Sequence, residues 1–192
     1  MHKIHLIGES AGGGLILSTL QYIQEKYVET SIVASNVGLA VLLSPFTDMS
    51  LKYTHSSYEE NKNKDAHLSL NMITSVREFV SGIRNAEGQK TKDFDDKLFE
   101  LWYISPIYGN VRKMTSARIL FTVSQYEILR DDSVQMYNKI KSEDKTRKVD
   151  IWFYNSTVHA LPVLAPYIPE AMDAVLNIAF YMKHHIAELD QA

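Results

Sequence analysis

Thirteen residues near the start of the chain, 5–17, change from apolar to glycine-rich and back to apolar: HLIGESAGGGLIL. Before the glycines, residues 3–7 have the composition of a short strand. After them, residues 11–27 place Leu15, Ile16 and Leu20 at helical spacing. The segment therefore predicts a strand, a tight turn and a helix in direct succession, with one serine at the turn.

The turn itself, Gly8-Glu9-Ser10-Ala11-Gly12, has the spacing G-x-S-x-G of a nucleophile elbow. In such an elbow the serine occupies a strained turn, and small residues two before and two after it let the strand and helix pack closely. Gly8 and Gly12 meet this requirement. The backbone N–H of Ala11 would lie at the helix N-terminus, where it stabilises a developing oxyanion. The alternative is a serine that only caps the helix.

Two phosphate-binding patterns do not fit the same glycines. Gly8 and Gly13 have Walker A spacing, but the Lys-Ser/Thr pair required next is missing. A dinucleotide fingerprint would need a third glycine at position 17, which is Leu17. The turn is therefore interpreted as the site of a reactive serine.

Strand and helix signals alternate along the rest of the chain. Apolar runs predict strands at residues 37–43, 117–123 and 149–154, and helical patterns predict helices at about 133–141 and 169–189. This alternation implies right-handed crossovers between parallel strands. We therefore expect one α/β domain over residues 1–192, with a parallel sheet of about four strands and helices on both faces.

Residues 48–104 interrupt this alternation with charged stretches and two expected helices, at about 70–83 and 94–103. Such an insertion forms a lid or pocket wall in some proteins, and a plain crossover explains the composition equally well. Five aromatic residues between positions 94 and 108 suit an apolar pocket, but a core role is the favoured interpretation. They are Phe94, Phe99, Trp102, Tyr103 and Tyr108.

A serine nucleophile needs a base and an acid, which on this architecture follow in the order serine, acid, histidine, each after a strand. Of the seven histidines, His159 alone follows an expected sheet strand. For the acid, Glu127 lies nearest the end of the preceding strand. Asp131 and Asp132 suit the start of the next helix, although position alone leaves Asp131 open as the acid.

Five segments resemble the hormone-sensitive-lipase-like branch of the α/β-hydrolases (fold-3 carboxylesterases and lipases), which includes microbial carboxylesterases and fungal steryl acetyl hydrolases. GESAGGGL is similar to the family's G-[DE]-S-A-G-G elbow, LLSPFTDMS to the strand and loop after it, and YISPIYG to its Ser-Pro segment. EILRDDS resembles D-P-L-R-D, and VHALP resembles H-x-F. The resemblance covers the whole chain and implies Ser10 as nucleophile, Glu127 as triad acid and His159 as base.

The resemblance implies a serine carboxylic ester hydrolase that acts on small-molecule esters, with apolar acyl or acetyl esters such as steryl acetates as the expected class. The family usually has aspartate where this chain has Glu127. It also carries an H-G-G-G-type oxyanion loop upstream of the elbow, which this sequence lacks. We therefore expect the C-terminal half of an α/β-hydrolase fold, with residues 48–104 as its helical insertion. Peptidase activity is the second choice within the enzymes, and a catalytically inactive remnant that binds a ligand or partner is the alternative.

Net charge, apolar runs and cysteine content exclude several classes of partner and site. The net charge of −3 and the scattered basic residues give no reason to expect a nucleic-acid partner. No apolar run reaches the roughly 18 residues of a membrane span. The chain has no cysteine, which excludes disulfides, thiolate metal sites and cysteine nucleophiles. We expect no metal and no cofactor.

Two further expectations concern association and metal binding. The strand at residues 3–7 would form an apolar sheet edge through which the chain self-associates. His184 and His185 are neighbours on a helix, so we expect their side chains to diverge and to form a poor metal site. The sequence specifies no compartment: cytoplasmic is the default, and an ER or membrane-anchored location would require an upstream segment.

Overall fold

The computed structural model describes residues 4–26, 36–52, 56–83, 89, 95–115 and 117–190. Four strands form one sheet in the order β1-β2-β3-β4, and every neighbouring pair is parallel. The strands are β1 (Ile4–Glu9), β2 (Val37–Leu43), β3 (Arg118–Ser124) and β4 (Val149–Tyr154). The predicted four-stranded parallel α/β sheet is confirmed, and each strand lies within two residues of its expected position.

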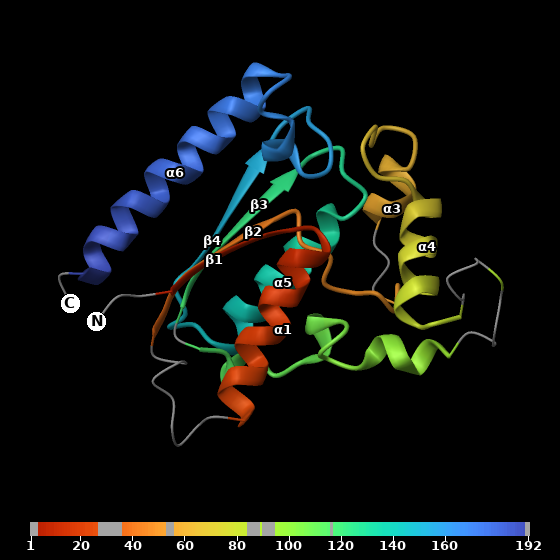
Figure 1. Ribbon diagram of the computed structural model, residues 1–192, viewed down its shortest axis with the longest axis horizontal. Coiled ribbons are helices and arrows are strands. Elements are labelled where there is room, and N and C mark those ends of the chain that lie inside the picture. Colours follow the sequence, from red (N-terminus) through yellow and green to blue (C-terminus); the bar gives the residue numbers. More distant parts are fainter. Residues whose placement is uncertain are drawn as a thin grey trace.

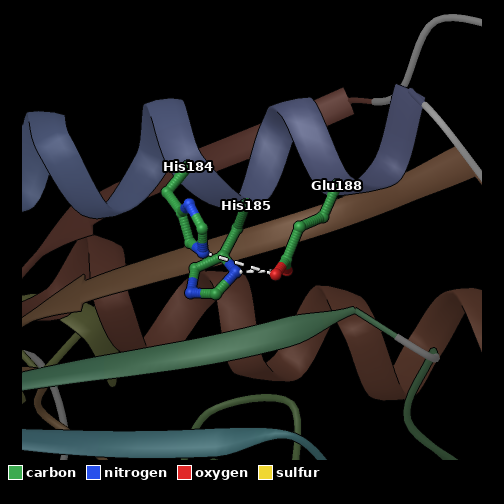
Figure 2. A group of neighbouring side chains, drawn as sticks. All are labelled: His184, His185 and Glu188. Atoms are coloured by element: carbon green, nitrogen blue, oxygen red, sulfur yellow. Dashed lines mark hydrogen bonds and ion pairs between the residues drawn. The ribbon is translucent and has the colours of Figure 1, made fainter.

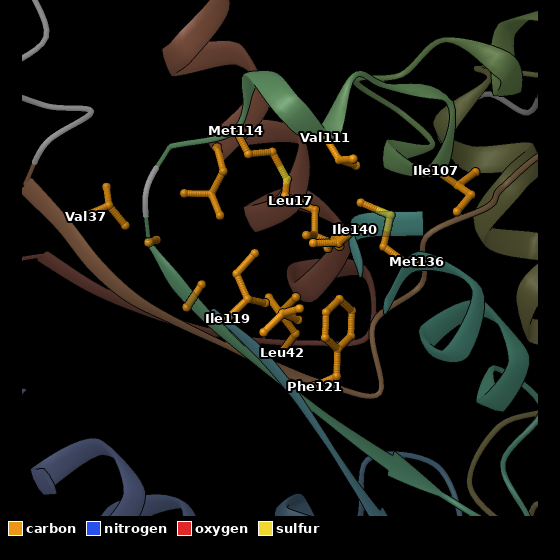
Figure 3. Close-up of a cluster of buried hydrophobic side chains, with 14 of the residues drawn as sticks. Leu17, Val37, Leu42, Ile107, Val111, Met114, Ile119, Phe121, Met136 and Ile140 are labelled. Carbon is orange, nitrogen blue, oxygen red and sulfur yellow. The ribbon is translucent and has the colours of Figure 1, made fainter. Parts of the chain in front are cut away.

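Helices cover both faces of the sheet (Figure 1). On one face lie α1 (Ala11–Lys26) and α5 (Arg130–Glu143), and on the other lies α6 (Pro169–Asp190). Figure 3 shows the larger core, in which apolar side chains of α1 and α5 pack against β2 and β3. Ile178 of α6 packs on the opposite face of the same strands. Because both faces are covered, every residue of β2 is buried, as expected for a central parallel strand.

The segment between β2 and β3 adds a separate layer beside the sheet. It contains α3 (Ser56–Asn61), α4 (Leu70–Val80) and three short 3₁₀ helices, η1 (Asp96–Glu100), η2 (Pro106–Tyr108) and η3 (Val111–Lys113). In Figure 1, α3 and α4 lie at the opposite side of the molecule from α6. A second core joins this layer to the loops that follow β2 and β3, with Phe46, Tyr58, Ile73, Phe99 and Leu129 among its members.

The structure corrects the expected helices of this segment. The helix predicted at 70–83 ends at Val80. The helix predicted at 94–103 is only the 3₁₀ helix η1, and Phe94 lies outside the described residues. The short α3 was not predicted, because its sequence SSYEEN has no apolar repeat. The predicted helix 133–141 begins earlier, at Arg130.

Apolar side chains remain exposed on β1 and α1. Ile7 is 54% exposed, and β1 pairs with β2 alone among the described strands. Leu15, which was expected on the buried stripe of α1, is 66% exposed, whereas Leu17 is fully buried. Ile16 and Leu20 of the predicted stripe do pack in the larger core, so the prediction was wrong for Leu15 alone among these three residues. Among the described residues, no helix is both long and apolar enough to cross a membrane.

Candidate active site

Ser10 lies in the turn between β1 and α1, in a left-handed backbone conformation with φ of 51°. Such a φ is strained for a residue other than glycine and persists only where neighbouring groups fix it. Here the Ser10 N–H donates to the carbonyl of Leu43 at 2.8 Å, and the Ser10 carbonyl accepts from the N–H of Phe46 at 2.9 Å. The end of β2 therefore holds the serine turn in place.

The glycines around Ser10 have different roles from those expected. A side chain at Gly8 would come within 2.6 Å of the Gly12 backbone, so the close packing predicted at this position is present. The prediction was wrong for Gly12, where a Cβ would meet open space. Gly13 and Gly14 are crowded as well: a Cβ at Gly13 would come within 2.7 Å of Pro45, and a Cβ at Gly14 would collide with the carbonyl oxygen of Phe46. The packing of β1 on α1 thus depends on Gly8, and the packing of α1 on the loop after β2 depends on Gly13 and Gly14. Gly12 lines the pocket described below.

The structure brings Ser10, His159 and Glu127 together at the carboxyl ends of β1, β4 and β3. Ser10 Oγ lies 3.0 Å from His159 Nε2, and His159 Nδ1 lies 3.2 Å from Glu127 Oε2. An ionised carboxylate only accepts hydrogen bonds, so Nδ1 carries a proton toward Glu127, which leaves Nε2 of the neutral ring to accept from the serine. The sequence order serine, acid, histidine therefore becomes a continuous line of hydrogen-bonding groups.

Glu127 is fully buried at the end of β3. Burial raises the pKa of Glu127, against hydrogen bonds from His159, Ser44 and the Ser124 N–H that lower it. The carboxylate is therefore held by three donors in a site without solvent. Asp131, the alternative acid, lies elsewhere: it pairs with Arg130 at 2.8 Å and accepts the N–H of Ser57 at the start of α3 at 3.0 Å.

A second carboxylate contacts His159 from the other side of the ring. Glu9 Oε1 lies 3.3 Å from His159 Nε2, the same nitrogen that faces Ser10. Burial alone would lower the pKa of His159, but the hydrogen bonds to Glu127 and Glu9 raise it to about 9. At neutral pH this environment favours the imidazolium form of His159.

Three polar residues that were not predicted from the sequence fix the backbone of the His159 loop. Asp65 Oδ1 accepts the N–H of His159 at 3.3 Å, and His67 Nδ1 donates to the His159 carbonyl at 2.9 Å. Ser44 Oγ accepts the N–H of Ala160 at 3.1 Å. The only sequence signal was the Asp65-Ala66-His67-Leu68 turn, in which Asp65 accepts the next backbone N–H groups, and nothing in it pointed to residue 159.

An apolar pocket of about 470 Å³ opens beside Ser10 and His159. Its walls combine the serine turn with the layer between β2 and β3, and they are formed by Glu9, Ser10, Ala11, Gly12, Phe46, His67, Leu68, Met72, Ile73, Val76, Leu129, His159 and Val163. The residues that α4 contributes to the pocket wall, Met72, Ile73 and Val76, all have apolar side chains. Ala11 is the first residue of α1, so its N–H has no acceptor within the helix and faces this region.

The four described residues of the aromatic set, for which a core role was favoured over a pocket role, do not line this pocket. Phe99 is fully buried in the second core, and Tyr108 packs against the main core. Trp102 and Tyr103 contact each other edge to face, and neither lines the pocket. The core interpretation therefore holds for Phe99 and Tyr108, and α4 supplies the apolar side chains of the pocket instead.

His184 and His185 do not diverge as predicted. Both rings turn toward Glu188 one helical turn further along α6, with nitrogen-to-oxygen distances of 3.4 Å and 2.7 Å (Figure 2). Adjacent residues on a helix point about 100° apart at Cβ, but long side chains can bend back toward a shared partner at i+3 or i+4. Among the described residues, His184, His185 and Glu188 are the group whose nitrogen and oxygen atoms lie close enough together to bind one metal ion.

Comparisons with known proteins agree with this architecture. A family model described as an alpha/beta hydrolase fold matches residues 1–163. No match was found among curated proteins. Solved structures similar to this chain include EstE5 soaked in ethyl alcohol, with a TM-score of 0.74 and 21% identity over 95% of this chain and 53% of that chain.

Two further solved structures give similar values. A hyperthermophilic esterase from the archaeon Pyrobaculum calidifontis has a TM-score of 0.74 and 21% identity, over 94% of this chain and 52% of its own. An esterase from the bacterial hormone-sensitive lipase family has a TM-score of 0.72 and 23% identity, over 95% and 53%. At these identities the likeness shows the fold. The chain spans about half the length of the solved structures that it matches.

Proposed function

The chain belongs to the alpha/beta hydrolase fold family, and we propose that it is the triad-bearing half of a serine carboxylic ester hydrolase. In this proposal Ser10 is the nucleophile, His159 the general base and Glu127 the acid that orients the histidine. The proposal rests on two contacts beside an apolar pocket: Ser10 Oγ lies 3.0 Å from His159 Nε2, and His159 Nδ1 lies 3.2 Å from Glu127 Oε2.

The proposed reaction proceeds through an acyl-enzyme. His159 Nε2 takes the proton of Ser10 while Oγ attacks the ester carbonyl carbon, and the same proton then passes to the departing alcohol oxygen. A water molecule, deprotonated by His159, attacks the acyl group and releases the carboxylic acid. Glu127 keeps Nδ1 protonated throughout, so that Nε2 of the neutral ring faces the serine.

In the tetrahedral intermediate the former carbonyl oxygen is negatively charged, and backbone N–H donors must stabilise this charge. Within the described residues we assign this role to Ala11, whose N–H begins α1 next to Ser10. Loss of one oxyanion donor costs on the order of 10²–10³ in rate. We therefore propose that full activity requires at least one further donor besides Ala11, of the kind that the family's upstream glycine loop supplies.

The proposed substrates are small esters with an apolar acyl group. This is supported by the aliphatic side chains Leu68, Met72, Ile73 and Val76 in the pocket and by the esterases that share the fold. We propose that residues 48–104 act as the insertion that covers the site, because α4 provides most of these side chains. Within this class we propose acetate esters, including steryl acetates, and this narrower choice rests on the sequence resemblance alone.

The test is hydrolysis of p-nitrophenyl acetate, butyrate and palmitate by the purified protein, with Ser10→Ala as the inactive variant and Ser142→Ala, an exposed serine of α5, as the matched control. We expect turnover of the short esters that is lost only in Ser10→Ala. A folded protein that hydrolyses none of the esters would refute hydrolysis by this chain alone and favour a binding remnant. Activity that survives Ser10→Ala would refute Ser10 as the nucleophile.

A further inference from the structure

A second cluster of chemically reactive side chains lies far along the chain from Ser10, near the C-terminal end of α6. The donor atoms of His184, His185 and Glu188 all lie within 4.8 Å of one another (Figure 2). The proposed hydrolase reaction uses none of these residues. Two imidazole nitrogens and one carboxylate oxygen are a donor set that open Zn²⁺ sites use, with water completing the coordination.

The helix itself creates this arrangement. His184 and Glu188 are related by i,i+4, and His185 and Glu188 by i,i+3, so both histidines reach the carboxylate from the same side of α6. His184 Nε2 lies 3.4 Å from one carboxylate oxygen and His185 Nδ1 lies 2.7 Å from the other. A cation placed between the three groups would replace these two contacts with bonds to the same donor atoms.

Packing against the sheet holds one of the three side chains. The ring of His185 meets Tyr181 edge-on, with 4.3 Å between their centroids. The Tyr181 hydroxyl donates to Asp150 Oδ2 at 2.6 Å, and its ring meets Trp152 edge-on at 5.1 Å. His185 is therefore oriented by β4 through Tyr181, which reduces the conformational entropy that a ligand would lose on metal binding.

The local charges permit a divalent cation. Glu188 is an exposed carboxylate whose Oε2 accepts from His185 Nδ1 at 2.7 Å. Arg118 lies 4.0 Å from Glu188, but it also pairs with Asp150 at 3.4 Å. The two carboxylates outweigh the one guanidinium, which leaves a net negative charge beside the two imidazole rings.

We propose that His184, His185 and Glu188 form a surface site for a divalent transition-metal ion of the Zn²⁺, Ni²⁺ and Cu²⁺ class. Imidazole nitrogens favour these ions over Mg²⁺ and Ca²⁺, which prefer sets of oxygen ligands. An ion bound there would link residues 184, 185 and 188 in the last turns of α6. It would stabilise the folded state by RT ln(1 + [M]/Kd), where [M] is the free metal concentration. The site is independent of the proposed hydrolase reaction.

The first test is calorimetric titration of the untagged protein with ZnCl₂, with MgCl₂ as the reference ion. We expect one saturable Zn²⁺ site and no Mg²⁺ binding, with His184→Ala and Glu188→Gln each weakening Zn²⁺ at least roughly tenfold. Lys183→Ala, an exposed neighbour on the same helix, should bind Zn²⁺ like the unmodified protein. Equal Zn²⁺ affinity in all four proteins, or no Zn²⁺ binding by the unmodified protein, would overturn the proposal.

The second test locates the ion. The chain has two tryptophans, and Trp152 connects to His185 through Tyr181. In a Trp102→Phe background, Cu²⁺ at the proposed site should quench the fluorescence of Trp152, and His184→Ala should abolish this quenching at the same Cu²⁺ concentration. Quenching that persists in His184→Ala would place the ion elsewhere and contradict the assignment.

Discussion

Two carboxylates act on the imidazole of His159 from its two nitrogens. Glu127 contacts Nδ1 at 3.2 Å and is buried, whereas Glu9 contacts Nε2 at 3.3 Å and is partly exposed. Nε2 also faces Ser10 at 3.0 Å, so Glu9 and the serine compete for one nitrogen. The ion pair with Glu9 needs a protonated ring, while the proposed base needs a neutral one. Against burial, the hydrogen bonds to Glu127 and then Glu9 raise the pKa of His159 to about 9.

Glu9→Gln should therefore make the base available at lower pH. Because the folded pKa of His159 lies above its usual range, labelling of Ser10 by a fluorophosphonate should rise with pH through about 9. Removal of the Glu9 charge lowers this midpoint, and each unit of the fall gives roughly tenfold more neutral imidazole near pH 7. The pH profile of the labelling rate measures the shift, with Glu170→Gln of α6 as the distant control. An unchanged or higher midpoint in Glu9→Gln would contradict the role of Glu9.

Glu127→Gln should leave the fold intact and greatly slow the reaction. The amide can accept from His159 through its oxygen, or donate through its nitrogen and stabilise the wrong tautomer of the ring; in a serine triad this change costs on the order of 10⁴ in kcat. Asp131→Asn, at the alternative acid, should keep near-normal rates because Asp131 pairs with Arg130 and α3 instead. Ester hydrolysis at matched protein concentration compares the two variants, and equal losses would remove the distinction between the acids.

The three residues of the proposed triad were predictable because each follows a strand, and parallel strands present their carboxyl ends at the same edge of the sheet. The role of Gly12 was not predictable, because the motif does not say which small residue faces the packed side of the helix. Glu9 occupies a position that the motif leaves unspecified. Its contact with His159 depends on the path of the loop after β4, which local pattern does not determine.

Asp65 connects the layer between β2 and β3 to the loops of the proposed triad. Its two carboxylate oxygens accept four backbone N–H groups, those of His67, Leu68, Ile128 and His159. Ile128 directly follows Glu127, so one buried carboxylate holds the backbone beside both the acid and the base. The layer that supplies the pocket wall therefore also fixes the position of the reacting groups.

Asp65→Asn should reduce activity more than it reduces stability. The amide nitrogen faces at least one N–H that it cannot accept, so either the Ile128 or the His159 loop must shift. A displacement of about 1 Å of a catalytic group costs on the order of 10² in rate. The measurements are kcat and KM, together with the thermal midpoint. Asp96→Asn, an exposed aspartate of η1, is the matched control, and an unchanged kcat in folded Asp65→Asn would refute the positioning role.

Elements with strong apolar patterns were predicted well, and those without them were not. All four strands and the long helices α1, α5 and α6 appear near their expected bounds. The short α3 and the 3₁₀ helices form because tertiary contacts hold them, for example the N–H of Ser57 on Asp131 at the start of α3. The convergence of His184 and His185 depends on side-chain bending toward Glu188, which helical spacing alone does not reveal.

The sheet as a whole is asymmetric in its exposure. β2 and β3 are covered on both faces, whereas β1 lies at one edge with Ile4 and Ile7 exposed. Unpaired backbone groups and apolar side chains at a sheet edge favour pairing with another chain. The chain spans about half the length of the solved structures with this fold.

Ile7→Lys should therefore lower self-association of the isolated chain. A charge at the exposed edge of β1 opposes strand pairing between molecules, whereas Ile7→Val keeps the apolar edge and serves as the matched control. Sedimentation velocity over a range of concentrations measures the effect. An unmodified chain that stays monomeric, or association that is unaffected by Ile7→Lys, would show that this edge is not used.

Whether Ser10 is an activated nucleophile in this fold is decided by fluorophosphonate labelling of the purified, folded chain, followed by mass spectrometry of the labelled peptide. We expect one label on Ser10, lost in Ser10→Ala and strongly slowed in His159→Ala, because His159 Nε2 lies 3.0 Å from the serine oxygen. A folded, monodisperse sample that takes up no label, or takes it up at another residue, would contradict the assignment of these residues as a working hydrolase site.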